Sequence, residues 1–251
     1  MNYIFSSMGN DSMALIQWMH DDGQDAVVVY NNTGWASDVW PQRVAQGRAL
    51  VESFGFGWME TEAMGFWELA QKKKAFPRNG MQFCTEHLKR LPSLALLDQL
   101  DPDGDDVCVV GIRREESRSR STFPEYTEES SAHGNRSLWA PLVRYTTADR
   151  DKLLAKTGMP ILPHRSQECF PCINANRADL QRLTEARIVL IEGMERKMGV
   201  GVRSGKQKWF FRPYRHQGAE GIRAVKAWAD KKPAKGADPQ LSFDCDSGFC
   251  V

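Results

Sequence analysis

The alternation of short apolar runs with helix-like stretches constrains the fold of this chain more than any other feature. Residues 25–32 (DAVVVYNN) and 105–112 (DDVCVVGI) are β-branched apolar runs, which is the pattern of strands buried on both faces of a sheet. Apolar spacing predicts helices at 12–21, about 37–54 and 84–100. Strands and helices in this order predict an α/β fold with an open, mostly parallel sheet flanked by helices.

Weaker patterns complete the expected organisation. Short strands are expected at 3–6 and 57–61, and Pro92 should kink or split the helix in which it lies. The polar stretch 113–137 predicts a long loop, a feature that is usually functional or disordered in compact domains. Further helices are expected at 147–158 and 174–198.

Composition excludes some classes of protein. Lys and Arg number 33 against 32 Asp and Glu, so the net charge of +1 argues neither for nor against a nucleic-acid partner. No apolar run approaches the roughly 18 to 20 residues that a membrane span needs. The amino terminus reads directly into a strand, so we expect no signal peptide and a cytoplasmic location. In that reducing compartment, six cysteines indicate metal or redox chemistry before disulfides.

The loop between the first strand and the first helix, residues 6–12 (SSMGNDS), has the composition of an anion site. Backbone N–H groups at a helix N-terminus bind anions, glycine allows close approach, and the Ser7 and Ser12 hydroxyls add donors. The expected ligand is a phosphate, although the sequence is not a Walker A motif. The alternative is a plain strand-to-helix turn with Asp11 or Ser12 as the N-cap.

The same stretch resembles the Ser-Gly-Gly-x-Asp-Ser pyrophosphate loop of the ATP pyrophosphatases. That group, the adenine nucleotide alpha-hydrolase-like family with its HUP-like fold, includes the phosphoadenylylsulfate (PAPS) reductases and several sulfur-transfer enzymes. Four positions fit the pattern: Ser7, Gly9, Asp11 and Ser12. Met8 replaces the first glycine, a departure that could narrow the phosphate site.

Five further segments resemble elements of the PAPS reductase-like family in the same order, so the resemblance covers roughly residues 3–175. Asn32 stands where many members have Asp, in a turn that lies near the adenosine in that family. The segments are the Thr-Gly turn and helix at 30–42, the Cys-x(3–4)-Lys-x-x-Pro element at 83–92, Gly-x-Arg-x-x-x-Ser-x-x-Arg at 111–120, the Trp-x-Pro segment at 137–163 and Cys-x-x-Cys at 169–172.

The segments that follow predicted strands should meet at one rim, because ligands of open α/β sheets bind at the carboxyl ends of the strands. Arg113 and Arg120 offer planar forks for phosphate or sulfate oxygens, and Lys89 could add a point charge. Glu115 and Glu116 are either solvated loop charges or Mg²⁺ ligands. The expected nucleotide-binding residues are Ser6, Ser7, Met8, Gly9, Asn10, Asp11, Ser12, Asn32, Thr33, Gly34, Gly111, Arg113, Ser117 and Arg120. The expected catalytic residues are Asp11, Lys89, Arg113, Cys245 and Cys250.

The resemblance implies a metal centre built from cysteines. Cys169 and Cys172 have the spacing that lets two sulfurs reach one centre, and Cys84 is the expected third ligand. Phe83 stands where cluster-bearing relatives often have a second cysteine, so the three cysteines leave one ligand position unfilled. Either Cys250 or Cys245 supplies the fourth ligand, or one iron of the cluster stays open to carry sulfide. A [4Fe–4S] cluster is favoured, with zinc or plain thiols as alternatives. Cys108, within VCVV, is expected in the core.

Two C-terminal features leave alternatives open. The ending CDSGFC resembles the reactive cysteine on the mobile tail of PAPS reductases, and its thiols could serve as nucleophile, ligand or frayed end. Residues 203–216 (RSGKQKWFFRPYRH) mix cations with aromatic residues. They either contact nucleic acid, or pack Trp209 and Phe211 on the core.

The expected organisation is a nucleotide-binding domain over 1–165 and a cysteine-containing extension over 166–251 that packs on this domain. Three hypotheses about function follow from these features. The first is an ATP-dependent sulfur-transfer enzyme, using Mg²⁺, that adenylates a small-molecule or nucleic-acid acceptor and receives sulfur from a donor. The second is a PAPS or adenylylsulfate reductase, in which a C-terminal cysteine attacks sulfur and a thioredoxin-like reductant resolves the product. The third is a non-catalytic nucleotide- or cluster-binding partner protein.

Overall fold

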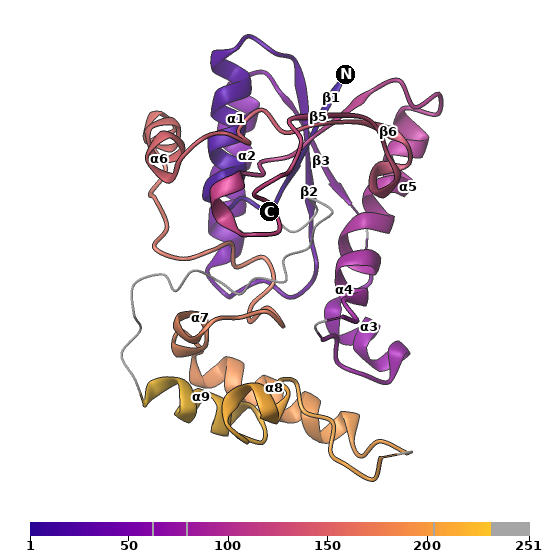
Figure 1. The fold of residues 1–251 in the computed structure, drawn as a ribbon, viewed down its shortest axis with the longest axis vertical. Helices are drawn as coiled ribbons and strands as arrows, with labels where there is room; N and C mark the ends of the chain where they lie inside the picture. Colours follow the sequence, from indigo (N-terminus) through magenta and orange to yellow (C-terminus); the bar gives the residue numbers. More distant parts are fainter. Residues whose placement is uncertain (62, 79, 203, 232–251) are drawn as a thin grey trace.

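The computed structural model describes residues 1–61, 63–78, 80–202 and 204–231. A six-stranded sheet in the order β3-β2-β1-β4-β6-β5 forms its centre (Figure 1). All neighbouring strands pair in parallel except β5 and β6, which confirms the expected open, mostly parallel sheet. The strands are β1 (Asn2–Ser6), β2 (Ala26–Asn31), β3 (Gly57–Thr61), β4 (Val107–Val109), β5 (Tyr126–Ser130) and β6 (Arg136–Trp139).

The helices cover both faces of this sheet. Helices α1, α2 and α6 lie on one face, and α5 lies on the other (Figure 1). Since all the parallel strands point the same way, the loops that leave β1, β2 and β4 meet at one edge. The helices are α1 (Asn10–Asp21), α2 (Trp40–Ser53), α3 (Phe66–Lys73), α4 (Phe83–Thr85), α5 (Leu91–Leu100), α6 (Thr147–Lys156), α7 (Arg177–Gln181), α8 (Glu185–Met198) and α9 (Ile222–Asp230).

The central strand β1 contributes to a separate core on each face. Ile4 belongs to the core under α1, α2 and α6, whereas Tyr3 and Phe5 belong to the core under α5, as the two-residue period of a strand requires. In the register, Tyr3 lies opposite Val27 on β2 and Cys108 on β4. Cys108 is fully buried, which confirms its expected place in the core.

A third core joins the C-terminal helices to the rest of the chain. Trp35, which follows β2, stacks on Phe66 of α3 with ring centroids 4.6 Å apart, and Phe210 lies 5.8 Å from Trp35. Helices α7, α8 and α9 contribute their apolar faces to the same cluster. This core takes residues from both sides of the expected boundary at residue 165, and that division stays a prediction.

Two sequence-based expectations need correction. The second half of the expected 113–137 loop forms β5 and part of β6, because β5 (YTEES) is a polar edge strand without the apolar alternation that marks buried strands. Between 83 and 100 the helix continues, divided by a π-helical turn at Glu86–Arg90. The expected split is thus present, but it precedes Pro92, which follows the π-helical turn as the second residue of α5. None of the helices in the described ranges is long and apolar enough to span a membrane.

We expect His133 to make the stability depend on pH. It is fully buried, and burial, with the charge of Arg90 adding to it, lowers its pKa to about 4. The unfolded imidazole titrates near its ordinary pKa of about 6.5. The stabilisation is therefore complete above that value and is lost as the pH falls toward 4. Replacing His133 with Gln should remove roughly 2 kcal/mol of the decrease in unfolding free energy between about pH 7 and about pH 5.

Urea unfolding of the wild type and of His133→Gln at the two pH values measures this difference. An equal pH dependence in both proteins would contradict the assignment to His133.

Candidate functional site

The β1–α1 loop presents an uncapped helix N-terminus. Helix α1 begins at Asn10 with Gly9 as its N-cap, and no side chain caps it, so neither Asp11 nor Ser12 has the capping role. The Ser12 hydroxyl instead accepts a hydrogen bond from the Ser7 N–H at 3.3 Å. The Ser7 hydroxyl oxygen is buried and has no hydrogen-bond partner among the described residues. An uncapped first turn beside a buried hydroxyl donor is suited to binding an anion.

Met8 occupies the core under α2 and does not extend in front of the loop. Its backbone is left-handed, with φ of 56°, which explains why a glycine is usual at this position of the motif. Its side chain is fully buried. A Cβ on Gly47 of α2 would lie only 2.5 Å from the Met8 sulfur, so the two residues fit together. The expectation that Met8 narrows the phosphate site is therefore wrong.

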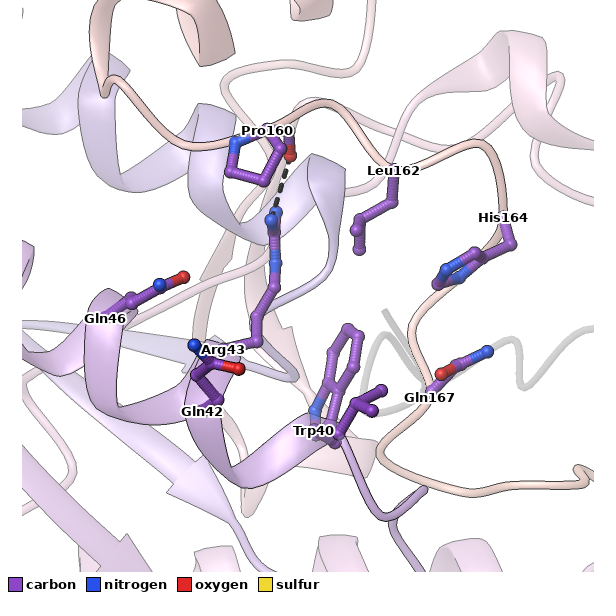
Figure 2. Close-up of a pocket in the computed structure, with 9 residues that line it drawn as sticks. Trp40, Gln42, Arg43, Gln46, Pro160, Leu162, His164 and Gln167 are labelled. Carbon is purple, nitrogen blue, oxygen red and sulfur yellow. Dashed lines mark hydrogen bonds between the residues drawn. The ribbon is translucent and has the colours of Figure 1, made fainter.

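Arg43 of α2 supports the loop from the side of the same core. Its Nε donates to the Met8 carbonyl at 3.0 Å and its Nη1 to the Pro160 carbonyl at 2.8 Å. Its Nη2 is buried without a hydrogen-bond partner among the described residues, and burial lowers the Arg43 pKa. A cavity of about 260 Å³ lies between α2 and residues 160–167 (Figure 2). It is lined by Val39, Trp40, Gln42, Arg43, Gln46, Pro160, Leu162, His164 and Gln167, so the expected nucleotide-binding residues lie elsewhere.

The segment that follows Pro160 fixes the loop at two further points. The Asn10 amide makes two hydrogen bonds with the backbone of Leu162, donating at 2.9 Å and accepting at 3.0 Å. The Ser166 hydroxyl donates to the Ser7 carbonyl at 3.1 Å. Asn10 therefore positions the loop, and its side chain is engaged in doing so.

Asp11 and Arg113 meet at the N-terminus of α1. The Arg113 Nε lies 2.5 Å from Asp11 Oδ1, and its Nη1 lies 3.2 Å from Glu115 Oε2. Arg150 of α6 approaches the other oxygen of Asp11 at 3.8 Å. Burial is the largest single effect and lowers the Arg113 pKa, but the charge and hydrogen bond of Asp11 and the charges of Glu116 and Glu115 together raise it above its ordinary value. Two residues that are 102 positions apart thus form one charged cluster with Arg150.

Gly111 allows this close approach, because even a Cβ at this position would press on the backbone of α1. A Cβ on Gly111 would lie 3.1 Å from the carbonyl oxygen of Asp11 in the first turn of α1. Further along the same loop, Arg120 is buried and its Nη1 donates to Glu116 at 2.6 Å. The Arg120 Nε is buried without a hydrogen-bond partner in the described part of the chain. Burial, and then the charge of Asp11, raise the pKa of Glu116.

The outer part of the β4 loop is more exposed. The Ser117 hydroxyl lies 3.0 Å from that of Ser119, and both hydroxyls can exchange this bond for one to solvent or ligand. Glu115 is half exposed, and its carboxylate pairs with Arg113. Both acidic residues of the loop therefore serve as partners of arginines.

The turn after β2 lies beside the β1–α1 loop at the same edge of the sheet and forms a second side of the candidate site. Gly34 has φ of 62°, and a Cβ there would lie 3.0 Å from the Gly65 Cα. Asn32 is exposed, and its side-chain oxygen accepts the Gly34 N–H at 3.0 Å. Thr33 is fully buried. These contacts fix the turn against the start of α3.

Glu168 ties this turn to the cysteine pair, and sequence reasoning missed it. Its carboxylate accepts the Thr33 backbone N–H at 2.9 Å, the Thr33 hydroxyl at 3.1 Å and the Tyr30 hydroxyl. Burial raises its pKa. Cys169, the next residue, pairs with Trp35 in an isolated β-bridge. An acidic residue directly before an otherwise apolar Cys-x-x-Cys element was the available signal.

Three thiols lie at this end of the site. Cys84, Cys169 and Cys172 are free and pack at the edge of the third core. Burial first, and then the charges of the other two thiols, raise the Cys84 pKa to about 12, against a lowering effect of Lys89. Burial also raises the pKa of Cys169, and Lys89, which is buried in the π-helical turn, opposes that rise. The structure thus places Lys89 beside the thiols.

The described residues contain no group of three or more His, Cys, Asp or Glu side chains arranged to hold a metal ion. Cys84, Cys169 and Cys172 are near enough for their charges to interact, but in this arrangement they do not form a metal site by themselves. The other expected ligands and nucleophiles, Cys245 and Cys250, lie outside the described residues. A cluster or a zinc ion at these thiols stays a prediction.

Comparison with known proteins identifies a family. The model of the phosphoadenosine phosphosulfate reductase domain matches residues 2–173. An uncharacterized 37.8 kDa protein in the gpa 5' region of Escherichia phage 186 is 24% identical over 161 residues, which cover 58% of this chain and 46% of that protein. This chain thus spans about half the length of that curated relative.

Two solved structures are similar at lower levels of identity. A phosphoadenylyl-sulfate reductase from Candida auris, in a phosphate complex, is 14% identical with a TM-score of 0.47, covering 63% of this chain and 73% of the other. An NMN synthetase from Francisella tularensis is 13% identical with a TM-score of 0.48, covering 92% and 84%.

Gly111→Ala tests the close approach of the β4 loop to α1. The added Cβ would press on backbone of α1, so we expect a loss of roughly 1 to 3 kcal/mol in unfolding free energy. Gly193→Ala in α8 is the matched control, because a Cβ there has nothing within 4 Å and a helix favours alanine. Urea unfolding of both variants measures the difference. A Gly111→Ala protein as stable as the control would contradict the close contact.

Proposed function

The chain belongs to the phosphoadenosine phosphosulfate reductase domain family, and we propose that it is an ATP-dependent sulfur-transfer enzyme. In this proposal ATP binds at the β1–α1 loop and is cleaved between its α- and β-phosphates to adenylate an acceptor. The observation that carries the proposal is the grouping of an uncapped helix N-terminus, the unpartnered Ser7 hydroxyl and the arginines around Asp11. Such a grouping favours a polyphosphate over an uncharged ligand.

The pyrophosphate portion of ATP would lie on the loop. Backbone N–H groups of the first turn of α1 and the hydroxyls of Ser7 and Ser12 are the donors for its oxygens. Arg113 and Arg120, both buried, are the cations nearest to the developing negative charge. The adenosine would extend toward Asn32, Thr33 and Gly34, which form the turn after β2 at the same edge of the sheet. Preformed donors of this kind stabilise a leaving pyrophosphate without further rearrangement.

Asp11 and Arg113 would exchange partners when the nucleotide binds. Arg113 now uses its fork on Asp11 and Glu115. A phosphate oxygen is an equivalent partner for the guanidinium, and the transfer frees the Asp11 carboxylate to bind the Mg²⁺ that accompanies ATP. Arg150, at 3.8 Å from Asp11, is placed to pair with a second phosphate oxygen.

The chemistry then proceeds in two displacements. An oxygen of the acceptor attacks the α-phosphorus, its bond forms as the bond to the bridging oxygen breaks, and pyrophosphate leaves. A persulfide sulfur, loaded on one of the thiols by a separate sulfur donor, next attacks the activated carbon and AMP leaves. A second thiol cleaves the resulting disulfide, which releases the thiolated acceptor, and a thioredoxin-like reductant restores the two thiols. Burial raises the pKa of Cys84 and of Cys169, and Lys89 would offset part of that rise when a thiolate forms.

A second candidate is the reduction of a sulfonucleotide, PAPS or adenylylsulfate. The arginines of the β4 loop favour it as well, since a sulfate has the same oxygen geometry as a phosphate. In that reaction a thiolate from the tail, Cys245 or Cys250, attacks the sulfur, sulfite is released when a reductant resolves the product, and no pyrophosphate forms.

Calorimetric titration of the full chain with α,β-methylene-ATP and Mg²⁺ tests the proposed site. We expect Arg113→Gln to weaken binding at least about tenfold, or about 1.4 kcal/mol, because a bidentate charge-assisted contact is lost. Arg48→Gln is the matched control, since this exposed arginine pairs with Glu52 on the outer surface of α2. Equal affinities of the wild type and Arg113→Gln would contradict the site. Tighter binding of PAPS than of the ATP analogue would favour the second candidate function, reduction of a sulfonucleotide, over sulfur transfer.

Metal content tests the cysteine set independently. As the alternative to the persulfide route, we propose that Cys84, Cys169 and Cys172 bind a [4Fe–4S] cluster together with a fourth ligand and that the cluster delivers the sulfur, with zinc as a further alternative. Anaerobically purified wild-type protein should then contain about four irons and about four acid-labile sulfides per chain, and Cys169→Ala should lose both. Cys108→Ala is the control, because this thiol is buried in another core. A finding of zinc in place of iron would assign a zinc site to these cysteines. A finding of no metal at all would contradict both metal sites and assign plain thiols.

A further inference from the structure

The segment that follows α8 is strongly basic. Residues 196–216 contain seven lysines and arginines and no aspartate or glutamate. The chain as a whole has a net charge of only +1, so this segment is a local departure from the average. A run of like charge on a folded surface requires a partner or solvent to stabilise it.

The aromatic residues of the segment divide into buried and exposed members. Phe210 and Phe211 are buried in the third core, and Phe210 lies 5.7 Å from Phe66 and 5.2 Å from Phe76. This confirms packing on the core for Phe211, one of the two residues expected there. Tyr214 is the opposite case, with 77% of its surface exposed. The buried pair anchors the segment, and the exposed ring remains on the surface.

The cations on either side of this anchor are exposed and unpaired. Lys197, Lys206, Arg212 and Arg215 are exposed, and Lys208 is half-buried. In the described part of the chain none of these five forms a salt bridge, whereas Arg48, Lys152 and Lys156 on the sheet domain pair with Glu52, Asp149 and Asp21. A cationic surface without internal counter-ions is available for an external polyanion.

The backbone holds several of these cations in fixed positions. Residues 199–202 and 204–208 pair with each other, since Val200 bridges to Gln207 and the Lys208 N–H donates to the Gly199 carbonyl at 3.0 Å. A 3₁₀ turn at Pro213–His216 places Tyr214 between Arg212 and Arg215. The positions of these charges are thus set by folded structure on both sides of the Phe210–Phe211 anchor.

A second set of exposed lysines lies on a helix that packs against the same anchor. Lys72 and Lys73 end α3, and Lys74 follows it. The buried face of α3 includes Phe66, which contacts Phe210. The helix that bears these lysines is thus packed on the same core as the basic segment.

We propose that the basic surface formed by Lys197, Lys206, Lys208, Arg212, Tyr214 and Arg215 binds single-stranded nucleic acid. The cations contact phosphates and the exposed Tyr214 ring stacks on a base, the combination by which proteins bind single strands without sequence preference. An acidic peptide would satisfy the cations but would leave the exposed tyrosine ring unused. This inference does not depend on the proposed sulfur transfer, because none of these residues belongs to the candidate nucleotide site.

Fluorescence anisotropy with a labelled single-stranded oligonucleotide, titrated with the full chain at several salt concentrations, tests this surface. The triple variant Lys206→Ala/Lys208→Ala/Arg212→Ala should bind at least tenfold more weakly. The slope of log affinity against log salt should become smaller by about two, since single strands lose about 0.7 counter-ions per neutralised phosphate. Tyr214→Ala should weaken binding, and Tyr214→Phe should retain it, because only the ring stacks.

The control variant Arg48→Ala/Lys152→Ala/Lys156→Ala removes the same number of positive charges from exposed, paired positions and should bind like the wild type. Equal weakening in the control would show an effect of net charge and overturn the assigned surface. Wild-type affinity in the first triple variant would also overturn it. So would an absence of wild-type binding at low salt, or tighter binding of an acidic peptide of equal charge.

Discussion

The ion pair between Asp11 and Arg113 joins the two loops on which the candidate site depends. One loop follows β1 and begins α1, and the other follows β4, so the pair connects neighbouring strands at their carboxyl ends. Gly111 favours the contact, because it lies against the backbone of Asp11 without a side chain. A buried arginine with carboxylate partners is stable without ligand. Phosphate oxygens can replace those carboxylates as partners with little loss of interaction free energy.

Met8 shows how a departure from a glycine motif can be accommodated. A non-glycine residue in the left-handed region costs roughly 1 to 3 kcal/mol. Burying a methionine side chain contributes roughly 1.5 to 3 kcal/mol, which offsets that strain. The absence of a side chain at Gly47 provides the space on α2, and the Arg43 contact with the Met8 carbonyl holds the backbone in place. The departure therefore changes the core and leaves the anion-binding face of the loop intact.

The elements that the sequence predicts well are those whose signal is local. The strand at 26–31 and the loop at 6–12 follow directly from buried β-branched residues and from small polar residues before a helix. Strand β5 was missed because an edge strand needs no apolar alternation. The rule that loops following parallel strands share one edge correctly indicated that the β1 and β4 loops meet, but it did not indicate that Asp11 and Arg113 contact each other.

Long-range polar contacts account for most of what the sequence did not predict in the site. Glu168 contacts Thr33 across 135 positions, and Ser166 contacts Ser7 across 159, so no local pattern marks either. Together they make residues 166–169 a connection between the anion-binding loop and the cysteines. Lys89 was expected near phosphate, which stays a prediction, and the sequence did not indicate that its charge also acts on the thiols of Cys84 and Cys169.

Hydrogen–deuterium exchange of the full chain, with and without ATP and Mg²⁺, tests most directly whether these loops form a nucleotide site. The account predicts slower exchange of the backbone amides in residues 6–13, 32–35 and 111–120 when the nucleotide is present, and unchanged exchange in α8 and α9. Protection confined to the cavity beside Trp40 and Arg43, or no protection anywhere, would contradict it.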